Sequence, residues 1–93
     1  MKEREFTIKN QAGIHCRPSG EILNALNKNF PDHEVEIVYN GETTEITGSM
    51  LSLISLGLAF GATGILRISG PEEEKAIREI GDLFEHEFDF PPY

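Results

Sequence analysis

The sequence is short of cysteine and of long apolar runs, and it contains no tryptophan. Its single cysteine, Cys16, excludes an internal disulfide and is compatible with the reducing cytoplasm, where we expect the protein. No apolar run approaches the roughly 20 residues of a membrane-spanning helix. The first ten residues also lack the apolar centre of a secretory signal. We therefore expect no membrane insertion.

Basic side chains are scarce as well. The chain has 8 Lys and Arg against 16 Asp and Glu, which gives a net charge of −8. A surface of this sign disfavours nucleic acid and anionic membranes as main partners. A basic protein partner remains open, and so does the simpler interpretation that the charge keeps the protein in solution.

What is present is typical of one small globular domain. The chain of 93 residues is too short for two ordinary domains, and its hydrophobic content of 39% is sufficient for one modest core. We assign residues 1–93 to a single domain and residues 86–93 to an irregular C-terminal tail, with Phe88 and Phe90 packing against the domain edge.

The spacing of apolar residues predicts seven elements. Alternation indicates strands, and apolar residues three and four apart indicate helices. The predicted strands are residues 4–10, 34–39, 43–46 and 64–69, and the predicted helices lie in residues 16–28, 49–57 and 70–88. The pair Asn40-Gly41 predicts a tight hairpin turn. Ser49 or Thr47 is expected to cap the second helix, and Pro71 to take the first position of the third.

The order β-α-β-β-α-β-α predicts an α+β open sandwich. The helices can cover one face of a four-stranded sheet while the other face meets water.

The segment "GIHCRPSG", residues 13–20, carries the most specific chemistry. A helix that begins near His15 presents backbone N–H groups and the positive end of its dipole, which together favour an anion. Arg17 adds forked donors that suit phosphate oxygens, and Pro18 fits a first helical turn. A neutral imidazole at this place is a nucleophile, and it lies beside groups that can bind a phosphoryl group. The alternative is a histidine that only caps the helix, next to a solvated arginine.

Two motifs resemble the HPr family, the histidine-containing phosphocarrier proteins of the bacterial phosphotransferase system. The first is the run Gly-Leu-His-Ala-Arg-Pro, which this chain matches at Gly13, His15, Arg17 and Pro18. The second is "SMLSLISLGLAFG", with Ser49, Ser55, Leu56 and Gly57 in register. The resemblance spans residues 2 to 85. It implies an HPr-like open-faced sandwich, a four-stranded antiparallel sheet covered on one face by three helices.

The resemblance also implies a mechanism. His15 would accept a phosphoryl group from phosphoenolpyruvate-charged Enzyme I and pass it to an EIIA-type sugar-permease component. Arg17, the amides of Cys16 and Arg17, and the turn formed with Pro18 would hold the phosphate. No metal and no cofactor are expected, and the chain would be a carrier within a phosphotransferase sequence rather than a stand-alone enzyme.

The resemblance places partner docking on the second helix. Mapped onto this chain, the docking residues are Met50, Leu51, Ile54 and Ser55. Leu53 and Leu56 are expected in the core instead, because a short amphipathic helix buries only one side.

Ser49 matches a serine that an HPr kinase/phosphorylase phosphorylates in some members, so that added charge stops transfer. The alternative role is helix capping. Gly48 and Ser52 depart from the family pattern here.

Other departures concern charge and partners. Asn24, Asn27 and Glu42 stand where the family often has basic residues, which leaves Arg17 and Lys28 as the nearby basic candidates. The alternatives are therefore a non-catalytic binding module on the same scaffold, contacting for example a transcription regulator, or a member of the nitrogen-regulatory branch.

For three further side chains, the structural interpretation is preferred to a functional one. Cys16 is expected to be a small, at least half-buried thiol without a redox role. His33, in a loop, is expected to be solvated. His86 lies among carboxylates, but its spacing matches no strong metal motif.

Overall fold

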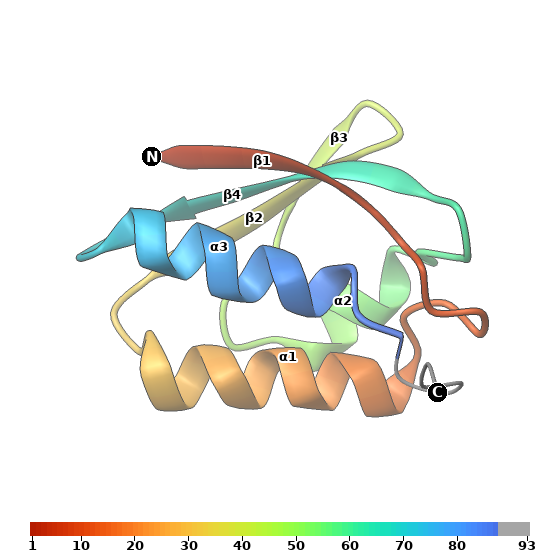
Figure 1. The fold of residues 1–93 in the computed structure, drawn as a ribbon, viewed down its shortest axis with the longest axis horizontal. Coiled ribbons are helices and arrows are strands. Elements are labelled where there is room, and N and C mark those ends of the chain that lie inside the picture. The colour runs from red at the N-terminus through yellow and green to blue at the C-terminus, as the bar shows by residue number, and fades with distance from the viewer. Residues whose placement is uncertain (88–93) are drawn as a thin grey trace.

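The structure is a computed structural model that describes residues 1–87. Its elements follow the predicted order β-α-β-β-α-β-α. The strands are β1 (Lys2–Thr7), β2 (Glu34–Tyr39), β3 (Glu42–Glu45) and β4 (Thr63–Ser69), and the helices are α1 (Cys16–Asn29), α2 (Met50–Ser55) and α3 (Glu73–Phe84). The strands form one antiparallel sheet in the order β1-β4-β2-β3 (Figure 1).

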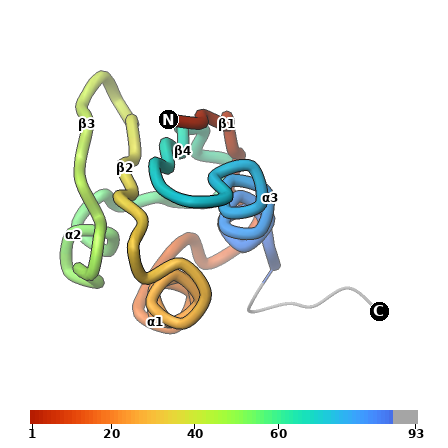
Figure 2. The backbone as a smooth tube through the Cα atoms, turned by 90° about the vertical axis from the view of Figure 1, so that its left-hand side faces the viewer, coloured from red at the N-terminus to blue at the C-terminus, as the bar shows by residue number. Residues whose placement is uncertain are grey.

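All three helices lie on the same face of this sheet. Figure 2, viewed from one end of the molecule, shows the strands in one layer and the helices together in a second layer. Helix α3 packs on β1 and β4, and α1 contacts both α2 and α3. The predicted α+β open sandwich, antiparallel and covered on one face by three helices, is thus confirmed.

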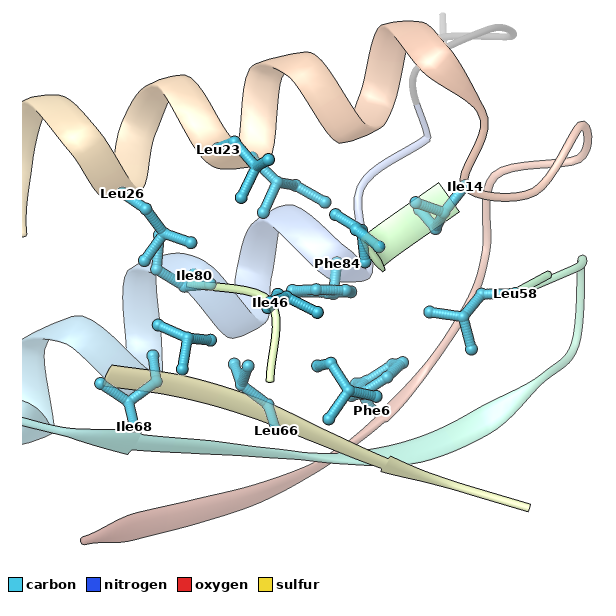
Figure 3. Close-up of a cluster of buried hydrophobic side chains, with 14 of the residues drawn as sticks. Phe6, Ile14, Leu23, Leu26, Ile46, Leu58, Leu66, Ile68, Ile80 and Phe84 are labelled. Atoms are coloured by element: carbon cyan, nitrogen blue, oxygen red, sulfur yellow. The ribbon is translucent and has the colours of Figure 1, made fainter. Parts of the chain in front are cut away.

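The core lies between the two layers. Alternate strand residues such as Phe6, Ile37 and Leu66 are almost fully buried, because period-two alternation directs them all toward the helices. The ring centroids of Phe6 and Phe84 lie 4.9 Å apart, and this contact packs the end of α3 against β1 (Figure 3). This one core contains buried residues from every described element except β3. The assignment of residues 1–93 to one domain stays a prediction, since it extends beyond the described residues.

The β2–β3 hairpin forms where Asn40-Gly41 predicted it. Both residues have positive φ angles, 56° at Asn40 and 81° at Gly41. A two-residue hairpin turn of this kind needs positive φ at both positions, and Asn and Gly adopt it at the lowest cost.

The start of α3 differs from the prediction. The helix begins at Glu73, preceded by Glu72 with φ 53° in the left-handed region, so Pro71 lies before the helix and not at its first position. The carbonyl of Pro71 instead accepts a hydrogen bond from Nε2 of His33.

The expectation that His33 is solvated is wrong. Its side chain is buried against Phe30 and the turn after β4. The ring centroids of His33 and Phe30 lie 5.1 Å apart in an edge-on arrangement. A Cβ atom at Gly70 would come within 2.7 Å of the imidazole, so glycine makes room for this ring. The predicted tail, residues 86–93, lies mostly outside the described residues, and Phe88 and Phe90 lie there too.

Candidate functional site

His15 is the residue that immediately precedes α1. Its backbone is extended, with φ −105° and ψ −159°, and its carbonyl accepts the N–H of Ser19 at 3.0 Å. The imidazole makes no capping hydrogen bond to the helix, although this is the N-cap position. The side chain is only half-buried. The interpretation of His15 as a side-chain cap is therefore wrong.

The first turn of α1 creates a positive electrostatic potential at this ring. Cys16 and Arg17 have exposed side chains, and their amides occupy positions for which the helical pattern supplies no acceptor. No acidic residue stands in the first turn. The aligned dipoles of a 14-residue helix therefore act on this spot without an opposing carboxylate from the same turn.

Two of the expectations for this turn need correction. Cys16 is exposed and not half-buried. Lys28 lies in the last turn of α1, about 20 Å along the helix axis from His15, because each residue advances the helix by about 1.5 Å. Of the two basic candidates, only Arg17 belongs to the neighbourhood of His15. Pro18 is buried and begins the packed face of the helix.

The loop after α2 and a local hydrogen bond from Asn10 hold the His15 segment in place. The N–H of Ile14 donates to the carbonyl of Leu58 at 2.8 Å, and both side chains enter the core from the same end of the molecule (Figure 3). Gly13 has φ 74°, and a Cβ there would lie 2.7 Å from the Leu58 oxygen. Fully buried Asn10 donates from Nδ2 to the carbonyl of Gly13 at 2.7 Å. The turn before His15 is thus fixed from two sides.

Helix α2 lies next to the start of α1. A Cβ built on Gly20 would lie 3.9 Å from the Met50 sulfur, which places Met50 over the second turn of α1. Met50 is 43% exposed and Leu51 75% exposed, whereas Leu53 is fully buried. The expected burial of Leu53 is confirmed, and the predicted docking residues Met50 and Leu51 are exposed.

The burial of the remaining side chains in and after α2 differs in part from the expectation. Ser55 is exposed, while Ile54 is half-buried and not fully exposed. Leu56 packs against the core but is only partly buried.

Ser49 is the N-cap of α2. Its Oγ accepts the N–H of Ser52 at 3.2 Å and donates to the Ser52 hydroxyl at 2.9 Å. The capping role predicted for Ser49 is confirmed, and Thr47 instead hydrogen-bonds to the backbone of Val35.

Two residues that belong to this region were not predicted from the sequence. Asn10 positions Gly13, and Phe60 is a large aromatic side chain left 64% exposed in the loop after α2. The available signal for Phe60 was its position in "AFG", an aromatic between two small residues in a turn. Nothing local predicted that this turn would lie beside the His15 loop.

A groove of about 330 Å³ lies elsewhere, between α1 and α3. It includes Glu79 and Asp82 but none of the residues predicted for the site, and its carboxylates disfavour an anion. Within residues 1–87, no three His, Cys, Asp or Glu side chains gather to hold a metal ion. Among the helices of that part of the chain, none is long and apolar enough to cross a bilayer.

The fold and the site together define a small α+β protein with a histidine at a helix entrance. A family model described as "PTS HPr component phosphorylation site" matches residues 2–86. The phosphocarrier protein HPr of Chlamydia trachomatis serovar D is 32% identical over 85 residues, which cover 89% of this chain and 73% of the relative. That of Chlamydia muridarum is 30% identical over 83 residues, covering 89% and 77%.

Solved structures agree in fold. The crystal structure of HPr-C-His from Thermoanaerobacter tengcongensis superposes with a TM-score of 0.79 at 27% identity, covering 95% of this chain and all of the other. The chain belongs to the HPr family. It is a phosphocarrier of the phosphotransferase system.

Proposed function

We propose that this chain carries a phosphoryl group on His15, received from phosphoenolpyruvate-charged Enzyme I and delivered to an EIIA-type sugar-permease component. The observation that carries the proposal is the placement of His15. Its imidazole stands at the positive end of a 14-residue helix whose first turn contains no carboxylate. We place this exchange in the cytoplasm, where a lone thiol such as Cys16 stays reduced.

The chemistry needs a neutral imidazole and a place for negative charge. One ring nitrogen of His15 uses its lone pair to form a bond to phosphorus, and the bond from phosphorus to the donor's residue breaks, with that pair leaving on the donor. The phosphoryl oxygens can then accept hydrogen bonds from the amides of Cys16 and Arg17 and from the Arg17 guanidinium. The phosphoryl group must then pass to the acceptor by the same kind of exchange. These contacts must therefore bind the phosphoryl group weakly enough for it to be released.

The test is transfer from Enzyme I with labelled phosphoenolpyruvate. Wild type should acquire one acid-labile, base-stable label, and His15→Ala should acquire none. His86→Ala is the matched control, because His86 is an exposed histidine that lies after α3. A wild-type chain that stays unlabelled with a competent Enzyme I, or a His15→Ala chain that labels normally, overturns the proposal.

Partner docking is part of the same proposal. Met50, Leu51, Ile54 and Ser55 form the side of α2 that would meet Enzyme I and the acceptor, and the exposure of Met50 and Leu51 supports this. Ser49 would be the regulatory phosphorylation site for a kinase. Its partial exposure and its place at the start of α2 support that role, because a phosphate there adds about two negative charges at the docking side.

A second candidate is a regulatory binding module on the same scaffold, or a carrier of the nitrogen-regulatory branch. The observation that favours it is charge: Lys28 lies at the far end of α1, so Arg17 is the one basic side chain that α1 places near His15. A basic patch for an acidic partner is therefore weak here. Labelling of His15 by Enzyme I, as above, decides between a carrier and a binding module.

A further inference from the structure

No described element covers one face of the sheet. All three helices lie on the opposite face (Figures 1 and 2). Side chains alternate along a strand, so the neighbours of buried Phe6, Ile37 and Leu66 point away from the helices. We call this side of β1, β2, β3 and β4 the open face. Its charged side chains are Glu3, Glu5, Glu34, Glu36, Glu45 and Arg67.

One row of charged side chains crosses the open face through all four strands. In the strand register, Arg67 lies between Glu3 and Glu36. Its Nε is 2.7 Å from Oε2 of Glu3, and its Nη1 is 4.0 Å from Oε1 of Glu36. On the next strand, Glu45 lies directly opposite Glu36. The signs therefore alternate from β1 to β2, but the row ends in two adjacent carboxylates, an arrangement that destabilises a sheet.

This end of the row needs positive charge. Within residues 1–87, no lysine or arginine forms an ion pair with the exposed carboxylate of Glu45. Glu5 and Glu34 add negative charge in the rows on either side. A metal ion does not match the arrangement, because the described residues bring no three acidic, His or Cys side chains together. The complementary occupant is a surface that carries several separate positive charges.

Apolar side chains lie beside the row. Val38 follows Glu36 on the open face, about 7 Å further along β2, and lies opposite Ile65. Both Val38 and Ile65 are half-buried. A long basic side chain can lay its methylene groups on such a surface while its charged end reaches a carboxylate. Arg67 has this setting on β4, where Ile65 is its neighbour, and Val38 offers the same setting on β2 to a basic side chain from a partner.

We propose that the open face binds a basic protein segment, with one of its arginine or lysine side chains between Glu36 and Glu45. Charge complementarity supports this occupant, because it supplies the positive charge that the row lacks. The inference is independent of the proposed function. His15 lies at the start of α1, in the helical layer on the other side of the sheet, so both sites can be occupied together.

The test titrates the isotope-labelled full chain with a peptide of about ten residues in which Arg and Thr alternate, since alternation puts all its arginines on one side of an extended chain. Amide shifts should gather on β2, β3 and β4, and a peptide with Gln in place of Arg should cause none. Raising KCl from about 0.05 to 0.5 M should weaken binding by roughly tenfold or more, because exposed charge pairs are screened.

Two matched double variants separate this face from net charge. Glu36→Gln/Glu45→Gln should raise the Kd of the peptide by about fivefold or more. It should melt no lower than wild type, because it removes a like-charge pair. Glu21→Gln/Glu79→Gln removes the same charge from exposed positions on α1 and α3, and its Kd should change by less than about twofold. Equal losses in the two variants show an effect of net charge only and overturn the inference.

Three other outcomes also overturn it. Shifts confined to the helices would place the peptide in the helical layer. A wild-type dimer in sedimentation that Glu36→Gln/Glu45→Gln dissociates would show that a second copy covers the open face. A bound peptide that blocks labelling of His15 would place it at the helix entrance instead.

Discussion

Arg4 and Glu85 join the first strand to the end of the last helix. Nη2 of Arg4 donates to Oε1 of Glu85 at 2.7 Å, and Oε2 of Glu85 accepts the N–H of Thr7 at 3.0 Å. The second guanidinium nitrogen donates to Asp82 at 3.0 Å. Both Arg4 and Glu85 are about three-quarters buried, so this cluster fastens α3 across β1 with charge-assisted hydrogen bonds.

The Glu85 contact predicts a pH-dependent stability. Partial burial raises the pKa of Glu85, but the Thr7 amide and Arg4 together outweigh it and lower that pKa below its ordinary value of 4.5. A lowered pKa stabilises the fold above about pH 4.5, and the contribution is lost as pH falls through the folded value. Glu85→Gln should therefore lower the free energy of unfolding by roughly 1 to 2 kcal/mol at pH 7. The difference from wild type should shrink at pH 3.

Urea unfolding at pH 7, 5 and 3 measures this difference. Glu79→Gln is the control, because Glu79 is exposed on the same helix, and its effect should stay within about 0.5 kcal/mol. A Glu85→Gln chain whose deficit is the same at pH 3 and pH 7 contradicts the prediction.

Gly13 predicts a steric effect beyond its backbone angle. Gly13→Ala introduces a Cβ 2.7 Å from the Leu58 oxygen, whereas Gly41→Ala, at a similar φ of 81°, meets nothing within 4 Å. Both variants bear the left-handed strain of about 1 to 2 kcal/mol. Gly13→Ala should lose about 1 kcal/mol or more in addition, because the two loops must separate. Equal unfolding free energies for the two variants would show that the close approach carries no energy.

Arg17 should matter for transfer and not for folding. Its exposed guanidinium stands in the first turn of α1. Arg17→Gln should reduce the kcat/KM of phosphorylation by about tenfold or more, because a charged donor to the phosphoryl group is lost. Lys28→Gln, which removes the same charge at the other end of the helix, should leave the rate unchanged. Similar losses in both variants would indicate a general effect of net charge instead.

Ser49 allows charge and capping to be separated. Ser49→Ala removes the hydrogen bond from the Ser52 N–H and should cost about 1 kcal/mol of stability, with little effect on the KM for Enzyme I. Ser49→Asp keeps a good capping group but adds negative charge beside α2. It should keep the wild-type melting temperature and raise KM severalfold. Paired melting curves and transfer assays check both, and an unchanged KM for Ser49→Asp argues against regulation at this serine.

The sequence predicted most of the local structure correctly. Alternation placed Phe6 and Ile37 in the core, Asn40-Gly41 set the hairpin, and the segment around His15 began a helix. These features depend on neighbours within a few residues, so composition and period are enough to determine them. The prediction failed where the local signal was weak. Pro71 suits a first helical position, but Glu72 adopts a left-handed conformation, and α3 starts two residues after Pro71.

The sequence by itself determined the order of the elements, the apolar faces and the presence of a histidine and an arginine at one helix entrance. The tertiary structure alone decided that His33 is buried. It also decided that the Phe60 turn lies against the His15 loop through the Ile14–Leu58 hydrogen bond. These are contacts between residues distant in sequence, and no local periodicity encodes which loops meet when the helices close over the sheet.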